Sequence, residues 1–199
     1  MDIFAHGLWA GAAGIASNRK LPRRLPMPWV VWWGLFPDLF AFTPNFGLML
    51  WLHYFGNPPA PLSRFGGGVR ELLPGWLQPH NLYLLSHSLV VFAALFGVVW
   101  LLRRKPALVL LAWPLHILMD IPTHRAGRFG TPFLWPISDY RFDGISWGQQ
   151  WFMILNHSAI AATYATLLIW HYSRRRQQPR AGQGAAEEAG VTTGRGVAG

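Results

Sequence analysis

Six ionisable side chains lie within or at the ends of strongly apolar segments, and their types could support metal chemistry. A charged group at membrane depth is costly, so such residues are usually paired, bound to an ion or part of a transport pathway. The chain has no cysteine, so disulfides and thiolate metal sites are excluded and any metal would be held by His, Asp or Glu. The six residues are His6, Asp38, His87, His116, Asp120 and His157.

The most specific local pattern among them is the pair His116 and Asp120. These residues stand four apart in the segment PLHILMDIP, so on a helix they share one face. Such a pair can offer one nitrogen and one oxygen to a single divalent ion. The alternative is a buried His–Asp hydrogen bond that only fixes helix packing. Pro122 is expected to end this helix before His124.

The other candidates each have a structural alternative. Asp38 follows Pro37 near the middle of an apolar segment, where a carboxylate is either protonated or paired with a metal or a histidine. His87 lies between two serines and could instead bond to a neighbouring helix. His6 stands in a segment rich in Gly and Ala, which suits close helix packing. His157 lies between Asn156 and Ser158 and could be a metal ligand or a residue that hydrogen-bonds to one.

Composition places these residues in a membrane protein. Of the 199 residues, 52% are hydrophobic and only 13% are charged, about half the usual share of a soluble domain. The 12 Trp residues also fit, because Trp gathers at membrane interfaces. The net charge of +9 does not indicate nucleic-acid binding, since no recognition motif accompanies it.

The hydrophobic pattern predicts an all-α, polytopic membrane bundle with about four to five apolar segments. One of them is short or re-entrant, because a full span needs about 20 residues. Pro37 and Pro44 are expected to kink or break the second segment. We divide the chain into a membrane-embedded helical domain, 1–176, and a disordered tail, 177–199. The predicted apolar segments are 3–17, 28–52, 82–102, 107–121 and 149–171, and 53–80 and 122–148 are loops.

The basic residues predict the topology. Most of the 17 Lys and Arg residues fall in the loop 18–26, the turn 103–106 and the C-terminal tail, and the positive-inside rule puts these on the cytoplasmic side. The loops 53–80 and 122–148 would then lie outside. Most of the candidate site residues would gather towards that outer face. There, His124, Arg125 and Arg128 could bind an anionic substrate group, although a solvated loop with local Arg–Asp pairs is an alternative.

The ordered motifs AHGLWAG, FPDLF, LLSHSLVVF and PLHILMDIPTHRAGRFGTPF resemble a known family. This is the YdjM-type family of membrane-bound, metal-dependent hydrolases, described as LexA-binding and associated with the bacterial inner membrane. The resemblance covers roughly residues 1–143 and implies His6, Asp38, His87, His116 and Asp120 as the metal site. The sequence departs from the family pattern after Asp38, where Leu39 and Phe40 replace further acidic residues or histidine, and in the run 81–86.

Together, these features predict a membrane-embedded hydrolase with a divalent metal, for which zinc is the best candidate. Asp38 would be a ligand or the general base. The expected partners are membrane lipids, with a lipid or lipid-linked phosphoester as substrate. Two other classes stay open. Broken helices with buried His and Asp also suit a small ion- or proton-coupled transporter. A structural or regulatory membrane protein would use the same residues only for packing.

Overall fold

A computed structural model describes residues 1–56 and 69–177, and this part of the chain consists of helices and connecting loops, with no strand. The chain forms two compact units, residues 1–160 and 161–199. The predicted disordered tail, apart from Gln177, lies outside the described residues. The α-helices are α1 (Ile3–Ser17), α2 (Met27–Phe55), α3 (Pro79–Ser86), α4 (Leu89–Arg103), α5 (Ala112–Thr123) and α6 (Gln150–Gln177), and three short 3₁₀ turns are η1 (Arg70–Leu72), η2 (Gly75–Leu77) and η3 (Leu108–Leu111).

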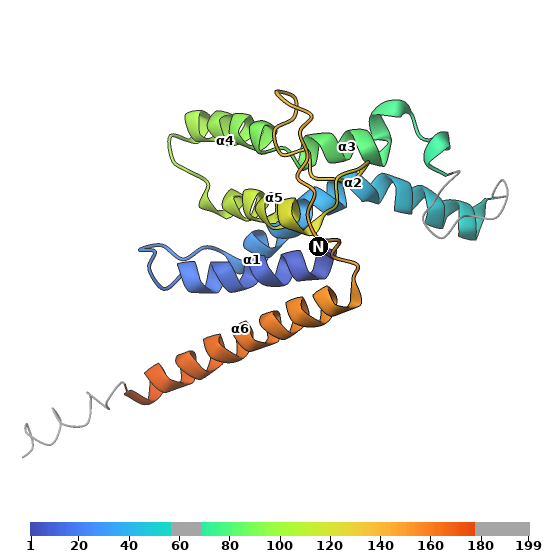
Figure 1. Ribbon diagram of the computed structural model, residues 1–199. Helices are drawn as coiled ribbons and strands as arrows, with labels where there is room; N and C mark the ends of the chain where they lie inside the picture. The colour runs from blue at the N-terminus through green and yellow to red at the C-terminus, as the bar shows by residue number, and fades with distance from the viewer. Residues whose placement is uncertain (57–68, 178–199) are drawn as a thin grey trace, which may run out of the picture. The chain divides into compact units, whose positions relative to one another are not determined.

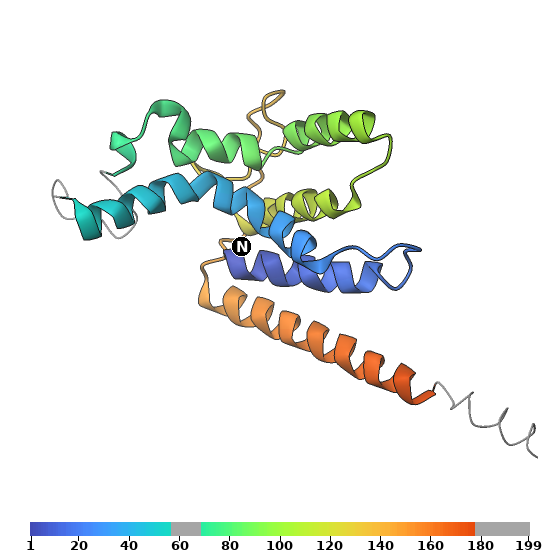
Figure 2. The same ribbon diagram turned by 180° about the vertical axis from the view of Figure 1, so that it is seen from behind.

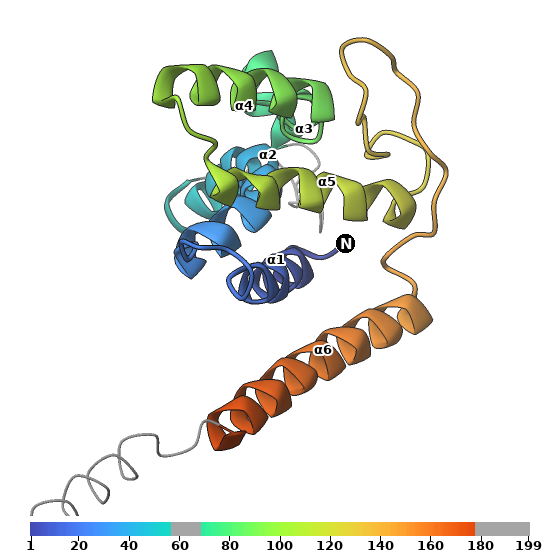
Figure 3. The same cartoon turned by 90° about the vertical axis from the view of Figure 1, so that its left-hand side faces the viewer.

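Helix α2 is the centre of the first unit, because α1, α3 and α5 all pack against it. Figures 1 and 3 show α5 lying between α4 and α1. Pro37 and Pro44 do not break α2, which remains one helix of 29 residues. Each proline still removes one backbone donor from the helix.

Small residues bring α1 and α2 into close contact. A Cβ atom added at Gly7 would lie 2.8 Å from Leu35 Cδ2, and one added at Gly34 would overlap Ala10. The Gly34 position would also lie 3.3 Å from the backbone oxygen of His6. Gly and Ala faces allow such backbone approach within membranes. The small residues that flank His6 therefore fix its distance from α2.

The segment 82–102 is not the single straight span that hydropathy predicts. It is broken into α3 and α4, which are bent by 60° at His87 and Ser88. The Ser88 hydroxyl accepts hydrogen bonds from the backbone N–H groups of Val90 and Val91, both at 3.1 Å, and so caps α4. It also donates to the Trp135 carbonyl. The capping serine starts a new helix and leaves His87 at the corner.

Helix α5 follows η3 and ends at Thr123, as the position of Pro122 predicts. Its Trp113 ring packs edge-on against Phe36 of α2 and Phe92 of α4, with centroids 5.0 and 5.6 Å away. Aromatic packing of this kind adds to the free energy gained by burial. This aromatic packing fixes the position of α5 along α2, so that the polar residues of α5 face α2.

The loop between α5 and α6 returns to the end of α5. The N–H groups of Gly144 and Ile145 donate to the carbonyls of His124 and Pro122, both at 2.9 Å. A Cβ at Gly144 would overlap the Pro122 carbonyl, so this approach requires glycine. Arg141 donates to the carbonyls of Gly127 and Arg128, and Asp143 accepts from Ala126 N. The loop is therefore held both by backbone hydrogen bonds and by the side chains of Arg141 and Asp143.

Length and composition support a membrane location. Helix α2 and residues 150–174 of α6 are long and apolar enough to cross a bilayer, and α3 with α4 would make a bent third span. Helix α1 and the segment 108–123 are apolar but shorter. Large side chains such as Leu102 (80% exposed) and Ile169 (67% exposed) face outwards, as lipid-facing residues do. The structure thus supports two or three spans, and the larger number of four to five stays a prediction.

Replacing Gly34 with alanine is expected to destabilise the first unit, because the added methyl group meets Ala10. Overpacking of this kind costs about 1–3 kcal/mol. Gly47 in the same helix has no neighbouring atom within 4 Å at its Cβ position, so Gly47→Ala is the matched control. Thermal unfolding of the purified protein should show a lower Tm for Gly34→Ala and an unchanged or higher Tm for Gly47→Ala. Equal Tm values for the two variants would contradict the packing described here.

Candidate metal centre

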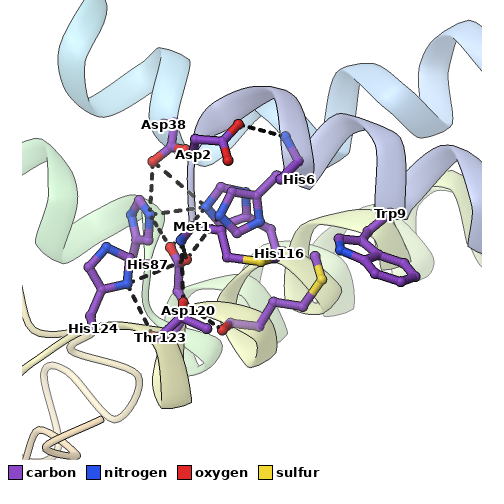
Figure 4. Close-up of polar contacts among 12 residues, drawn as sticks. Met1, Asp2, His6, Trp9, Asp38, His87, His116, Asp120, Thr123 and His124 are labelled. Atoms are coloured by element: carbon purple, nitrogen blue, oxygen red, sulfur yellow. Dashed lines mark hydrogen bonds and ion pairs between the residues drawn. The ribbon is translucent and has the colours of Figure 1, made fainter. Parts of the chain in front are cut away.

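Four polar side chains converge in the interior of the first unit. Asp38 comes from α2, His87 from the corner between α3 and α4, and His116 and Asp120 from successive turns of α5. One donor atom from each residue lies within 4.8 Å of the other three. Figure 4 shows their side chains pointing towards one another. We call these four residues the four-donor group.

The spacing of the donor atoms suits one metal ion. The Nε2 atoms of His87 and His116 are 3.2 Å apart. Asp120 Oδ2 lies 3.4 and 3.3 Å from these two nitrogens, and Asp38 Oδ1 lies 3.5 and 3.8 Å from them. Tetrahedral bonds of about 2.0–2.2 Å place neighbouring donors about 3.3–3.6 Å apart. The four contacts between nitrogen and oxygen are longer than ordinary hydrogen bonds, which are about 2.7–3.2 Å.

Backbone and hydroxyl partners orient the two imidazoles. His116 Nδ1 lies 2.7 Å from the carbonyl oxygen of Gly34, which can only accept, so Nδ1 carries the proton. In the neutral ring the Nε2 lone pair then points into the four-donor group. His87 Nδ1 lies 2.9 Å from the Ser86 hydroxyl, which can accept from it in the same way. This arrangement, with the outer nitrogen bonded and the inner one bare, is typical of metal-binding histidines.

Burial distinguishes the two carboxylates. Asp120 is 1% exposed and both histidines are fully buried, whereas the Asp38 side chain is 13% exposed. Solvent or a substrate therefore reaches the four-donor group most easily beside Asp38. The donor set of two imidazoles and two carboxylates is one that divalent cations such as zinc accept.

His6 is brought to this region but lies beside the four-donor group. Its ring stacks on that of His116 at 3.6 Å, and its Nε2 lies 2.9 Å from Asp120 Oδ1, the oxygen turned away from the other donors. His6 is fully buried, and neither ring nitrogen makes a well-directed hydrogen bond within the described part of the chain. The N-terminal ammonium of Met1 donates to the same Asp120 oxygen at 2.5 Å, so His6 and Met1 both lie against the outer side of this carboxylate.

The predicted substrate residues follow directly after α5. His124 Nδ1 lies 3.1 Å from the Asp120 carbonyl oxygen and 3.4 Å from its Oδ1. Burial lowers the pKa of His124, and the negative charge of Asp120 partly opposes this shift. His124 is thus a neutral imidazole at pH 7. Arg125 and Arg128 are exposed in the following loop, so their role in binding substrate stays a prediction.

His157 is not part of the four-donor group. Its side chain is 46% exposed, with Nε2 3.7 Å from Asp2 Oδ2, and Nδ1 lies 2.9 Å from the carbonyl of Met153. None of these contacts joins His157 to the four-donor group. His157 instead provides a matched control for substitutions at the buried histidines.

Several residues that shape the site have no functional signal of their own in the sequence. Tyr83 stacks on His87 with ring centroids 3.7 Å apart. Trp113 Nε1 donates to the Ser86 carbonyl at 2.7 Å, which ties the end of α3 to α5. Ser86 itself could have been suspected because it adjoins His87 in the sequence. The Gly34 carbonyl could not, since its role depends on the packing of two distant helices.

Comparisons with known proteins add no relative: no protein family, curated protein or solved structure matches the chain. The resemblance to the YdjM-type family therefore stays a prediction from the motifs.

Metal content is the first test of the four-donor group. The purified protein should hold about one divalent ion per chain, and His116→Ala or Asp120→Ala should remove most of it, because each deletes one donor from a four-donor site. His157→Ala should retain the wild-type content. Elemental analysis of the detergent-purified variants measures this. Equal metal content in all four proteins would exclude the site.

The Ser86 hydroxyl gives a finer test. Its loss in Ser86→Ala should raise the Kd for zinc by about 10- to 100-fold, the usual effect of removing a partner that orients a metal-bound histidine. Ser173→Ala is the control, because the Ser173 hydroxyl bonds only within its own helix, to the Ile169 carbonyl. Competition with a chromogenic zinc chelator reports both affinities. Unchanged affinity in Ser86→Ala would show that the hydroxyl does not orient His87.

Proposed function

We propose that this chain is a membrane-embedded, metal-dependent hydrolase that acts on a lipid or lipid-linked phosphoester. The observation that carries the proposal is the convergence of four donor atoms, from Asp38, His87, His116 and Asp120, at distances suited to one ion. Ionisable residues at membrane depth are usually functional, and here they are grouped instead of being scattered over separate helix contacts.

Zinc is the proposed ion. A catalytic zinc keeps three protein ligands and an open position, and His87, His116 and Asp120 would supply the three. Such an ion acts as a Lewis acid and lowers the pKa of water towards about 7. Asp38 lies on the accessible side, so it can complete the ligand set or act as the general base.

The chain's own residues suggest how a phosphoester could be attacked. The Asp38 carboxylate would accept a proton from water as the water oxygen bonds to phosphorus. The phosphorus–oxygen bond to the leaving group would break, and the protonated Asp38 would return that proton to the leaving oxygen, which departs as an alcohol. The outer oxygen of Asp120 lies 2.5 Å from the Met1 ammonium and 2.9 Å from His6 Nε2, and these contacts would keep its inner oxygen directed at the imidazoles. Arg125 and Arg128 would bind the remaining phosphate oxygens, for which guanidinium groups are suited.

The membrane setting gives the substrate class. The basic loop 18–26 and the turn 103–106 lie at one end of the first unit, and α5 carries the four-donor group towards the other (Figure 1). By the positive-inside rule, we assign the basic end and the C-terminal tail to the cytoplasm of a bacterial inner membrane. The site would then open near the outer leaflet, where a lipid phosphoester can enter laterally from the bilayer. We retain the larger bundle of four to five segments and the YdjM-type family as part of this proposal.

Hydrolysis is tested with the purified protein in lipid nanodiscs, using phosphatidic acid and a polyisoprenyl phosphate as substrates and release of inorganic phosphate as the readout. Turnover should stop on chelation and return with added zinc. Asp38→Asn should lower kcat by about 10²- to 10⁴-fold, the usual contribution of general base catalysis, while His157→Ala stays near wild type.

Two outcomes would contradict the proposal. One is phosphate release that persists in Asp38→Asn and His116→Ala. The other is a protein that hydrolyses neither substrate but moves an ion or solute across vesicles without a metal requirement, which would favour a transporter.

A further inference from the structure

A hollow lies in the first unit, and none of the four-donor residues lines it. It has a volume of about 450 Å³ and is lined by the C-terminal half of α1, the loop after it, the start of α2 and the segment from η3 into α5. This volume falls in the range of small-ligand pockets, about 300–1,000 Å³. Its walls are apolar, and among the residues that line it only Lys20 is charged.

The hollow exists because one face of α1 carries only small side chains. Ala10, Ala13, Gly14 and Ser17 follow the spacing i, i+3, i+4 and i+7, so they form a single stripe along the wall. The opposite wall carries the longer side chains of η3 and α5, among them Leu108, Leu111 and Leu115. An apolar hollow lined by small and branched side chains can accept a hydrocarbon chain.

Basic residues are concentrated at the end of the first unit where Lys20 lines the hollow. The loop that contains Lys20 also carries Arg19, Arg23 and Arg24, and the turn 103–105 leads directly towards η3. Figures 1 and 2 show both connections at the same end of the first unit. The sequence has no Asp or Glu in 3–37 or in 72–119. An anionic group is therefore attracted to this end without competition from acidic residues on these segments.

We infer that the hollow binds an acyl chain of an anionic phospholipid, with the lipid phosphate held by Lys20. The apolar walls account for the acyl chain, and the basic loop accounts for the preference for a negative headgroup. Anionic lipids at the cytoplasmic surface attract basic segments next to membrane helices. The site is separate from the four-donor group and does not depend on the proposed hydrolase activity.

The test is native mass spectrometry of the full chain, purified in detergent, stripped of lipid and titrated with dioleoyl phosphatidylglycerol or dioleoyl phosphatidylcholine. The wild type should retain one phosphatidylglycerol in preference to phosphatidylcholine. Lys20→Gln should reduce this preference about fivefold, the usual effect of one basic residue near an anionic lipid. Lys105→Gln is the matched control, because Lys105 belongs to the same basic end but does not line the hollow, and it should change the preference less than twofold.

Filling the hollow tests the acyl-chain half of the inference. Ala13→Phe should abolish retention of both dioleoyl lipids, and Ser17→Phe, on the same stripe, provides a second variant if the first does not fold. Dihexanoyl phosphatidylglycerol should bind the wild type far more weakly than the dioleoyl lipid, since each methylene lost from an apolar pocket costs about fourfold in affinity. Equal retention of both headgroups by the wild type, or full retention by a folded variant with the hollow filled, would overturn the inference.

Discussion

The structure depends on the buried carboxylate of Asp120 and the nitrogens that surround it. Its Oδ1 lies 2.5 Å from the N-terminal ammonium of Met1 and 2.9 and 3.4 Å from His6 and His124, and its Oδ2 faces His87 and His116 at 3.4 and 3.3 Å. A carboxylate with no water around it is stable only when it is paired or bound to a cation. The Met1 ammonium pairs with Oδ1, and an ion between Oδ2 and the two inner nitrogens would pair with the second oxygen. The fold therefore brings imidazoles from distant parts of the sequence to the two oxygens of the Asp120 carboxylate.

Three departures from regular helix packing bring these groups together. The break between α3 and α4 leaves His87 at a corner, where its ring turns inwards. The missing side chain of Gly34 lets α1 approach α2 closely, and the carbonyl of the same residue holds His116. The return of the loop over the end of α5 fixes the position of His124. Each departure has a local cost in packing or helix continuity, which is typical of functional sites in otherwise regular folds.

The sequence could predict the features whose signal is local. The spacing of His116 and Asp120 places them on one helix face, and the structure has them there, one turn apart in α5. The apolar runs predict where the helices lie, but hydropathy cannot detect the 60° bend, because Ser88 is a weak polar signal within a long apolar run. No local feature of the sequence indicated that His6 would lie beside Asp120. It follows from the packing of α1 on α2, which residues distant in sequence determine. Asp38 and His87 were identified as costly residues, but only the folded chain shows that they face each other.

The claim that the four-donor group holds one ion is tested most directly by X-ray absorption at the zinc edge of the zinc-loaded protein. We expect about four nitrogen or oxygen neighbours at about 2.0–2.2 Å, with the multiple scattering of two imidazole rings from His87 and His116. His116→Ala, which lacks one of the four donors, should retain little zinc and so should not show this shell. A shell of six oxygen neighbours without imidazole scattering would contradict the account, because the ion would then be bound elsewhere.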